Sequence, residues 1–261
     1  MSVLMGAYNC ADTVEKSIRS IQEQTMSDWE LIVCDDGSSD GTLDILKRAA
    51  CGDPRIRIIS NECNRGLSYT LNRCIADATG EYCARMDGDD VCDPERFEKQ
   101  IAFLERHGEY GFVSTTMKKF DENGVYFVPD IGVPYSPTVD DFVKGSPFCH
   151  APVMIRRNAY ESVGGYRVAS WVLGVEDYDL WFRLYAAGIR GCVLQEPLYS
   201  MFDGRGANAR RTYRRRINEF KVRRSGYGEI GVPAIKKIYA IKPLIVGLIP
   251  KSLYRRLKSG R

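Results

Sequence analysis

Three carboxylates crowd one short run of the chain, Arg85-Met86-Asp87-Gly88-Asp89-Asp90. Like charges this close raise one another's pKa unless a cation compensates them. Carboxylate oxygens suit Mg²⁺ or Mn²⁺, and Mg²⁺ sites usually combine one or two carboxylates with the phosphates of a substrate. The run therefore indicates a divalent-metal site for a phosphorylated ligand. The alternative is a solvated turn that caps the next helix, since Asp is common in both places.

A second acidic run, Asp35-Asp36-Gly37-Ser38-Ser39-Asp40-Gly41-Thr42, follows an apolar segment. Its carboxylates could accept hydrogen bonds from a nucleobase or from ribose hydroxyls. The alternative is a helix N-cap made by Ser39 or Asp40. The turn Gly6-Ala7-Tyr8-Asn9 does not match the Gly-x-Gly-x-x-Gly loop of nicotinamide-binding folds, and the chain has no phosphate-binding loop of the Walker type.

Alternating strands and helices must position these runs. Strands are expected at four places: Ser2–Met5, Leu31–Cys34, Ile56–Ile59 and Tyr82–Met86. Helices are expected between them, one with Val14, Ile18 and Ile21 on a single face, and others over Gly41–Ala50 and Leu67–Ala78. This alternation predicts a doubly wound parallel sheet with right-handed crossovers, and it places both acidic runs at the same sheet edge.

Local signals refine the helix ends. Asp12-Thr13-Val14-Glu15 predicts a capping box, Gly80 is expected to end the third helix, and Pro94 is expected in the first turn of the next one.

The pattern of strands and helices changes in the second half of the chain. Two further strands are expected at Phe112–Met117 and Val125–Val128, with a hairpin turn at Glu122-Asn123-Gly124. A further helix is expected at Glu176–Ala187, and Gly188 is expected to end it.

The composition favours a globular cytoplasmic protein. The chain has 261 residues, enough for one large α/β domain with an appendage. Its nine cysteines form no Cys-x-x-Cys pair, and several stand in apolar segments, which predicts reduced thiols. Two histidines exclude a His-rich metal site. No signal peptide is expected before the first strand.

Charge is divided unevenly along the chain. Residues 205–261 carry 17 basic and 2 acidic residues, a net charge of +15, whereas residues 1–204 carry a net charge of −12. Such a tail suggests an anionic partner surface, and no named nucleic-acid motif supports nucleic acid. The apolar stretch Ile238–Pro250 is shorter than the roughly 18 residues that a spanning helix needs. It is either an interfacial segment on an anionic membrane or a helix packed against the body.

Five motifs in order, over about residues 3–200, resemble glycosyltransferase family 2. They are Ala7-Tyr8-Asn9, Asp35–Thr42, Asn64-Arg65-Gly66-Leu67, Arg85–Asp90 and Glu176-Asp177-Tyr178-Asp179-Leu180-Trp181-x-Arg183. The resemblance implies a GT-A fold, a Rossmann-like and mostly parallel sheet flanked by helices, here with a helical basic extension. We expect a transferase domain at 1–204, divided into a nucleotide-sugar half (1–110) and an acceptor half (111–204), and the extension at 205–261.

The resemblance also implies roles for individual residues. Tyr8 would stack on the nucleobase, Asp36 would hydrogen-bond it and Arg65 would lie beside it. Asp87 would contact ribose or metal, and Asp89 would be the main ligand of Mn²⁺ or Mg²⁺. Asp177 matches the catalytic base. Candidate contacts to the acceptor or the diphosphate are His150, Glu176, Trp181 and Arg205.

Each role has a structural alternative. Tyr8 could be a core aromatic, Arg65 a surface charge, and His150 a structural hydrogen-bonding group. Asp177 could simply be a first-turn acid favoured by the helix dipole, which would lower its pKa. A pocket shared with Glu176 would raise that pKa instead. The sequence leaves both directions open.

The expected activity is inverting, metal-dependent transfer of a sugar, with UDP as the first guess for the nucleotide. The acceptor would be a hydroxyl of a glycan or lipid-linked acceptor in cell-surface polysaccharide assembly. The Gln/Arg-x-x-Arg-Trp motif of processive synthases is absent, which favours single additions. The alternatives are a non-catalytic nucleotide-sugar-binding or scaffold protein, and a sugar-1-phosphate nucleotidyltransferase, whose Gly-rich first loop is missing. We expect a cytoplasmic protein, peripheral on the inner face of the membrane if the tail binds lipid.

Overall fold

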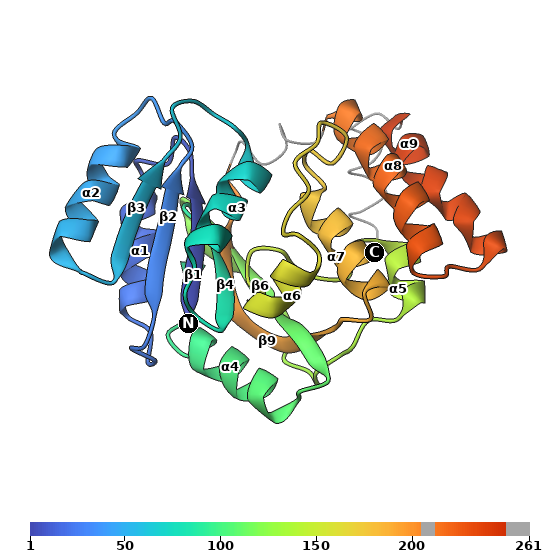
Figure 1. Cartoon of the computed structure of the whole chain (residues 1–261), viewed down its shortest axis with the longest axis horizontal. Coiled ribbons are helices and arrows are strands. Elements are labelled where there is room, and N and C mark those ends of the chain that lie inside the picture. Colours follow the sequence, from blue (N-terminus) through green and yellow to red (C-terminus); the bar gives the residue numbers. More distant parts are fainter. Residues whose placement is uncertain (205–211, 249–261) are drawn as a thin grey trace.

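A single twisted sheet runs through the molecule, and helices cover both of its faces (Figure 1). The computed structural model describes residues 1–204 and 212–248. Among them the sheet has nine strands in the order β3-β2-β1-β4-β8-β6-β9-β5, with β7 paired to β6. One end of the sheet consists of four parallel strands, β1 (Ser2–Ala7), β2 (Glu30–Asp35), β3 (Ile56–Ser60) and β4 (Tyr82–Asp87), with β3 at the edge. The expected strands are therefore confirmed.

The strand pleat divides the core into two layers. Leu4 of β1 faces one layer, whereas Val3 and Met5 face the other. Successive strand side chains point to opposite faces, so buried strands read as unbroken apolar runs. The helices of this half are α1 (Val14–Gln22), α2 (Thr42–Gly52), α3 (Leu67–Asp77) and α4 (Arg96–Arg106).

The second half of the sheet is mixed. β8 (Met154–Arg156) runs antiparallel to both β4 and β6 (Tyr110–Asp121), whereas β6 and β9 (Arg190–Phe202) are parallel. The predicted hairpin is confirmed, because β7 (Gly124–Phe127) pairs with β6 directly across the turn. The remaining elements are β5 (Val91–Cys92), α5 (Val139–Lys144), α6 (Arg157–Ser162) and α7 (Glu176–Ala186). All nine cysteines are free thiols, as expected.

Three predicted helix ends are wrong. The predicted capping box of Asp12 and Glu15 is absent, because the helix α1 begins at Val14 with Thr13 as its N-cap residue and has no side-chain cap hydrogen bond. The helix α3 ends at Asp77, before Gly80. The helix α4 begins at Arg96, so Pro94 lies in the preceding turn.

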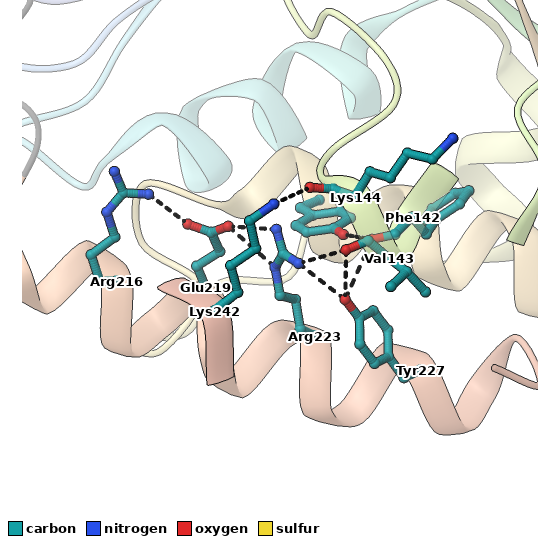
Figure 2. A network of polar contacts seen from close by, with 9 residues as sticks. Phe142, Val143, Lys144, Arg216, Glu219, Arg223, Tyr227 and Lys242 are labelled. Atoms are coloured by element: carbon teal, nitrogen blue, oxygen red, sulfur yellow. Dashed lines mark hydrogen bonds and ion pairs between the residues drawn. The ribbon is translucent and has the colours of Figure 1, made fainter. Parts of the chain in front are cut away.

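The C-terminal segment is helical in its described part and packs on the second half of the molecule. It contains α8 (Tyr213–Glu229), the 3₁₀-helix η1 (Ala234–Ile241) and α9 (Lys242–Leu248). Figure 2 shows Arg223 of α8 bonded to Glu219, to the Tyr227 hydroxyl and to the carbonyl of Val143 in α5. None of the helices in the described residues has the length and apolar character needed to cross a membrane.

Candidate active site

The loops after β1 and β2 are tied together at the carboxyl edge of the sheet. Asn9 has a left-handed backbone conformation, with a φ of 48° that Asn tolerates better than most residues. Its side-chain oxygen accepts a hydrogen bond from the Ser39 N–H at 2.9 Å, and its N–H donates to the Ser38 hydroxyl at 3.0 Å. The turn leaves Tyr8 48% exposed, so Tyr8 is not a core aromatic. Its stacking on a nucleobase stays a prediction.

Asp36 anchors the loop that leads into α3. It is buried, and its carboxylate accepts hydrogen bonds from the backbone N–H groups of Arg65 and Gly66, both at 2.8 Å. The side chain of Asn61 donates to it at 2.7 Å. These bonds give Asp36 a positioning role at the end of β2, and its predicted contact with a base stays a prediction.

Asp35 is a candidate that the sequence analysis did not assign, although it stands in the same motif. Its carboxylate is buried, and Oδ1 has no hydrogen-bond partner among the described residues. Buried polar atoms are normally paired, which makes this oxygen a candidate contact for a ligand. The following Gly37 has a φ of +70°, and a Cβ there would lie 2.7 Å from the backbone of Cys63. Only glycine lets the two loops approach this closely.

Arg65 extends from the same loop. Its side chain is exposed, and its guanidinium lies 4.8 Å from the ring centroid of Tyr69. Arg65 and Glu176 line a cavity of about 310 Å³ between the start of α3 and the segment before α7. The predicted position beside a nucleotide stays a prediction.

The acidic loop after β4 is held in place by two neighbouring elements. The Thr13 hydroxyl of α1's N-cap donates to the carbonyl of Gly88 at 2.8 Å, and the Ser17 hydroxyl donates to the carbonyl of Asp90 at 2.7 Å. On the other side, the Phe202 N–H of β9 donates to the carboxylate of Asp90 at 2.7 Å. The loop is therefore a rigid connection and not a freely solvated turn.

Three carboxylates of this loop could bind one metal ion together. Ligand atoms of Asp87, Asp89 and Asp90 all lie within 4.8 Å of one another. Burial, reinforced by the two neighbouring carboxylates, raises the pKa of Asp90 to about 8. A divalent cation relieves such crowding, and oxygen donors suit Mg²⁺ and Mn²⁺. The donor set fits the predicted cation, and Asp90 joins the two predicted ligands.

A cavity of about 610 Å³ opens beside the acidic loop. This volume lies within the roughly 300–1,000 Å³ of typical small-molecule sites. Its lining includes four predicted site residues, Asp87, His150, Glu176 and Asp177. It also includes three arginines that the sequence analysis did not assign, Arg85, Arg214 and Arg215. Asp89 instead lines a neighbouring cavity of about 540 Å³, and Tyr8 and Asp36 belong to neither lining.

Asp177 is a half-buried carboxylate in the first turn of α7. Burial, followed by the charge of Glu176, raises its pKa to about 6. The N–H of Tyr178 and the charges of Arg215 and Arg85 lower the pKa by less. Burial therefore raises the pKa of Asp177 by more than the N–H at the helix terminus lowers it. Of the two directions that the sequence left open, the pKa is raised. A carboxylate with this pKa can accept a proton near neutral pH.

His150 lines the cavity and is also held by a hydrogen bond, and its contact with the acceptor or the diphosphate stays a prediction. Its Nε2 lies 2.7 Å from the Tyr166 hydroxyl, which in turn lies 3.1 Å from the Tyr160 hydroxyl. Burial, followed by the charge of Arg85, holds the pKa of His150 well below its usual value. The side chain is therefore a neutral imidazole that lines the cavity and is fixed by a tyrosine pair.

The other candidate contacts differ in position. Oε2 of Glu176 is buried and has no hydrogen-bond partner among the described residues, so it can receive a donor from a ligand. Trp181 is fully buried and stacks on Phe112, with 5.1 Å between ring centroids. This place in the core does not support its predicted acceptor contact. Arg205 lies outside the described residues.

Arg214 and Arg215 reach the cavity from the first turn of α8. The aliphatic part of Arg215 packs on the backbone of Gly174, since a Cβ at that glycine would lie 3.4 Å from it. The available signal was the Arg-rich composition of residues 205–224, which by itself does not select the residues that face the site.

Comparisons with known proteins agree with this geometry. The profile described as "Glycosyl transferase family 2" matches residues 2–164. A Bacillus subtilis protein that carries the provisional name glycosyltransferase EpsE is 42% identical over 265 residues, covering 100% of this chain and 94% of its own length. The Escherichia coli protein UDP-Glc:alpha-D-GlcNAc-diphosphoundecaprenol beta-1,3-glucosyltransferase WfaP is 28% identical over 256 residues, with 94% of each chain covered.

A solved structure shows the same fold. The structure of Staphylococcus aureus TarS residues 1–349 in complex with UDP-GlcNAc superposes with a TM-score of 0.74 at 19% identity, covering 95% of this chain and 71% of that one. The family profile spans more than half of the chain, and the relative from B. subtilis spans all of it. The chain therefore belongs to glycosyltransferase family 2 and is a glycosyltransferase with the GT-A fold.

Proposed function

We propose that this protein transfers a sugar from a UDP-sugar to a hydroxyl group of a glycan or lipid-linked acceptor, with inversion at the anomeric carbon. The carrying observation is the cavity whose lining includes both Asp177, with its pKa raised to about 6, and Asp87 of the acidic loop. A base and a carboxylate of the proposed metal-binding loop in one cavity fit a single displacement.

In this mechanism Asp177 accepts the proton of the attacking hydroxyl. Its raised pKa leaves it ionised at neutral pH yet more basic than an exposed Asp. The hydroxyl oxygen forms the new bond to the anomeric carbon, and the bond to the diphosphate oxygen breaks on the opposite face. Glu176 and neutral His150 line the same cavity and would orient the acceptor hydroxyl and the donor sugar.

The transfer reaction also requires the negative charge that develops on the leaving diphosphate to be stabilised. A divalent cation, held by Asp89 with Asp87 and Asp90, would neutralise the negative charge that develops on the departing diphosphate. Arg85 balances Asp87, and Arg214 and Arg215 bring further positive charge to the lining of the same cavity. These cations favour a diphosphate over a neutral ligand.

The donor and the acceptor occupy different halves in this proposal. Tyr8, Asp36 and Arg65 hold the nucleotide at residues 1–110, and residues 111–204 supply the acceptor side, completed by α8. The name of the relative WfaP states a diphosphoundecaprenol-linked acceptor. We therefore place the reaction in lipid-linked polysaccharide assembly, on the cytoplasmic face of the membrane, with additions made singly.

Calorimetry with a set of nucleotide sugars, in the presence and absence of Mn²⁺, tests the donor. We expect one UDP-sugar to bind with Mn²⁺ and to bind at least about tenfold more weakly without it. Product analysis by NMR then gives the anomeric configuration, and retention would contradict the role of Asp177. Absence of heat with every nucleotide sugar would overturn the proposal.

A further inference from the structure

The 3₁₀-helix η1 presents a row of isoleucines to solvent. A 3₁₀-helix has three residues per turn, so side chains at i and i+3 lie one above the other. Ile235, Ile238 and Ile241 follow this spacing and are 83%, 71% and 46% exposed. Three large apolar side chains on one face of one helix are therefore left in water.

The row continues into α9. Ile245 and Leu248 follow at the spacing of neighbouring turns in an α-helix, and they are 56% and 73% exposed. We call Ile235, Ile238, Ile241, Ile245 and Leu248 the apolar ridge. Contiguous exposed apolar side chains of this kind mark interaction sites more often than isolated ones do.

The opposite side of these helices already has a partner. Ala240 and Pro243 are buried. A Cβ at Gly247 would lie 2.9 Å from the ring of Tyr213, so α9 packs closely on α8. Lys236 forms an ion pair with Asp140 of α5 at 2.7 Å. Because these contacts fix the body-facing side, the ridge cannot rotate inward without breaking them.

Positive charge surrounds the ridge. Lys237 and Lys242 are exposed. In the sequence, residues 249–261 add five basic residues and no acidic one. A second copy of the same surface would bring like charges together, which disfavours self-association. An apolar row flanked by lysines fits the surface of an anionic bilayer, because the apolar side chains can enter the acyl region while the lysines contact the negatively charged headgroups.

We infer that the apolar ridge docks this protein on an anionic phospholipid membrane, with the flanking lysines at headgroup level. Of the two arrangements that the sequence left open, the described residues 238–248 pack on the body with one side and leave the ridge side chains exposed on the other, so the membrane contact stays a proposal. Tyr239, also exposed at 53%, adds an aromatic side chain of the kind that favours the membrane interface.

Docking at the ridge would bring the cavity near the membrane. The first turn of α8 supplies Arg214 and Arg215 to the cavity, and the adjacent Tyr213 packs against α9. Figure 1 shows α8 and α9 together at the end of the molecule away from α2 and β3. This step rests on the proposed function, because it concerns access of a lipid-linked acceptor to Asp177.

Vesicle sedimentation of the full chain tests the ridge. The probes are vesicles of phosphatidylcholine alone and vesicles that also contain phosphatidylglycerol. We expect the wild type to sediment only with the anionic vesicles, and less so as salt rises. The double variant Ile235→Ser/Ile238→Ser should lower the partition coefficient by about tenfold or more, because two isoleucine side chains would no longer be buried among the lipid acyl chains.

Two further variants make the result specific. Val125→Ser/Val133→Ser removes apolar side chains that are 56% and 81% exposed outside the ridge, and it should bind as the wild type does. Lys237→Glu/Lys242→Glu should also weaken binding, most strongly at low salt. Circular dichroism and the melting temperature show whether each variant is folded, independently of nucleotide-sugar binding.

The outcomes separate this inference from the proposed function. Negligible binding of the wild type to both vesicles, or equal loss in the Val125/Val133 control, overturns the ridge and leaves the transferase assignment standing. A dimer in light scattering that Ile235→Ser/Ile238→Ser dissociates would assign the ridge to a second copy, which also overturns the inference. Vesicle binding by a protein that binds no nucleotide sugar would support the ridge and overturn the proposed function.

Discussion

Arg85 and Asp87 form an ion pair in the wall of the cavity that also contains Asp177. Nη1 of Arg85 lies 3.0 Å from Oδ2 of Asp87, and Nη2 contacts the other carboxylate oxygen. The buried Arg96 donates to the carbonyl of Arg85 at 2.8 Å and so fixes the backbone beneath the pair. Asp87 is therefore oriented and charge-balanced by Arg85, and we predict that Asp89 and Asp90 contribute more to cation binding than Asp87 does.

Replacing Asp89 should remove metal-dependent nucleotide binding. We expect Asp89→Asn to abolish the Mn²⁺-dependent part of UDP binding measured by calorimetry while the melting temperature stays near that of the wild type, because the change deletes a ligand oxygen in a half-buried position. Asp44→Asn, an exposed acid on α2, is the matched control. Unchanged Mn²⁺-dependent binding in Asp89→Asn would remove Asp89 from the metal site.

Replacing Asp177 should separate binding from turnover. We expect Asp177→Asn to bind the donor normally and to turn over roughly 10²–10⁴-fold more slowly, the usual contribution of a positioned general base. Initial rates at saturating donor and acceptor measure the effect. If turnover stays within a few-fold of the wild type, Asp177 is only a first-turn acid of α7.

The acidic limb of the pH profile should report Asp177. A base works in its deprotonated form, so kcat/KM should fall as the pH drops below about 6, the raised pKa of this carboxyl. Arg215 opposes that rise, so Arg215→Gln should move the limb to higher pH. Arg224→Gln, exposed on the same helix, should leave it in place. A limb that does not move in Arg215→Gln would contradict the electrostatic contact.

Loss of His150 should affect the reaction more than the fold. We expect His150→Ala to raise the acceptor KM or lower turnover by about tenfold or more, since the imidazole lines the cavity. Tyr166→Phe removes the hydroxyl that bonds to His150 and to Tyr160 but leaves the imidazole in place, and it should have a smaller effect in the same direction. A change in melting temperature with unchanged kinetics in His150→Ala would return this histidine to a purely structural role.

The sequence by itself determined the first half of the fold and the location of its acidic loops. Buried parallel strands must be apolar on both faces, so β1 to β4 read as short unbroken runs. Parallel strands end at one edge, so the carboxylates after β2 and β4 had to share that edge. The order of the motifs then indicated the family. Helix ends were predicted less well: α1 begins with Thr13 as its N-cap residue and without a side-chain cap, and the Thr13 hydroxyl donates to the carbonyl of Gly88, 75 positions along the chain.

The tertiary structure alone decided the chemistry of individual groups. The pKa of Asp177 depends on burial beneath segments that are distant in the sequence, and no local pattern encodes how much water those segments exclude. Arg214 and Arg215 could not be selected from an Arg-rich stretch until α8 was placed against the cavity. Helical periodicity likewise puts the ridge isoleucines on one face, but only packing against α8 and α5 decides that this face points to solvent, because periodicity carries no information about which side the rest of the molecule covers.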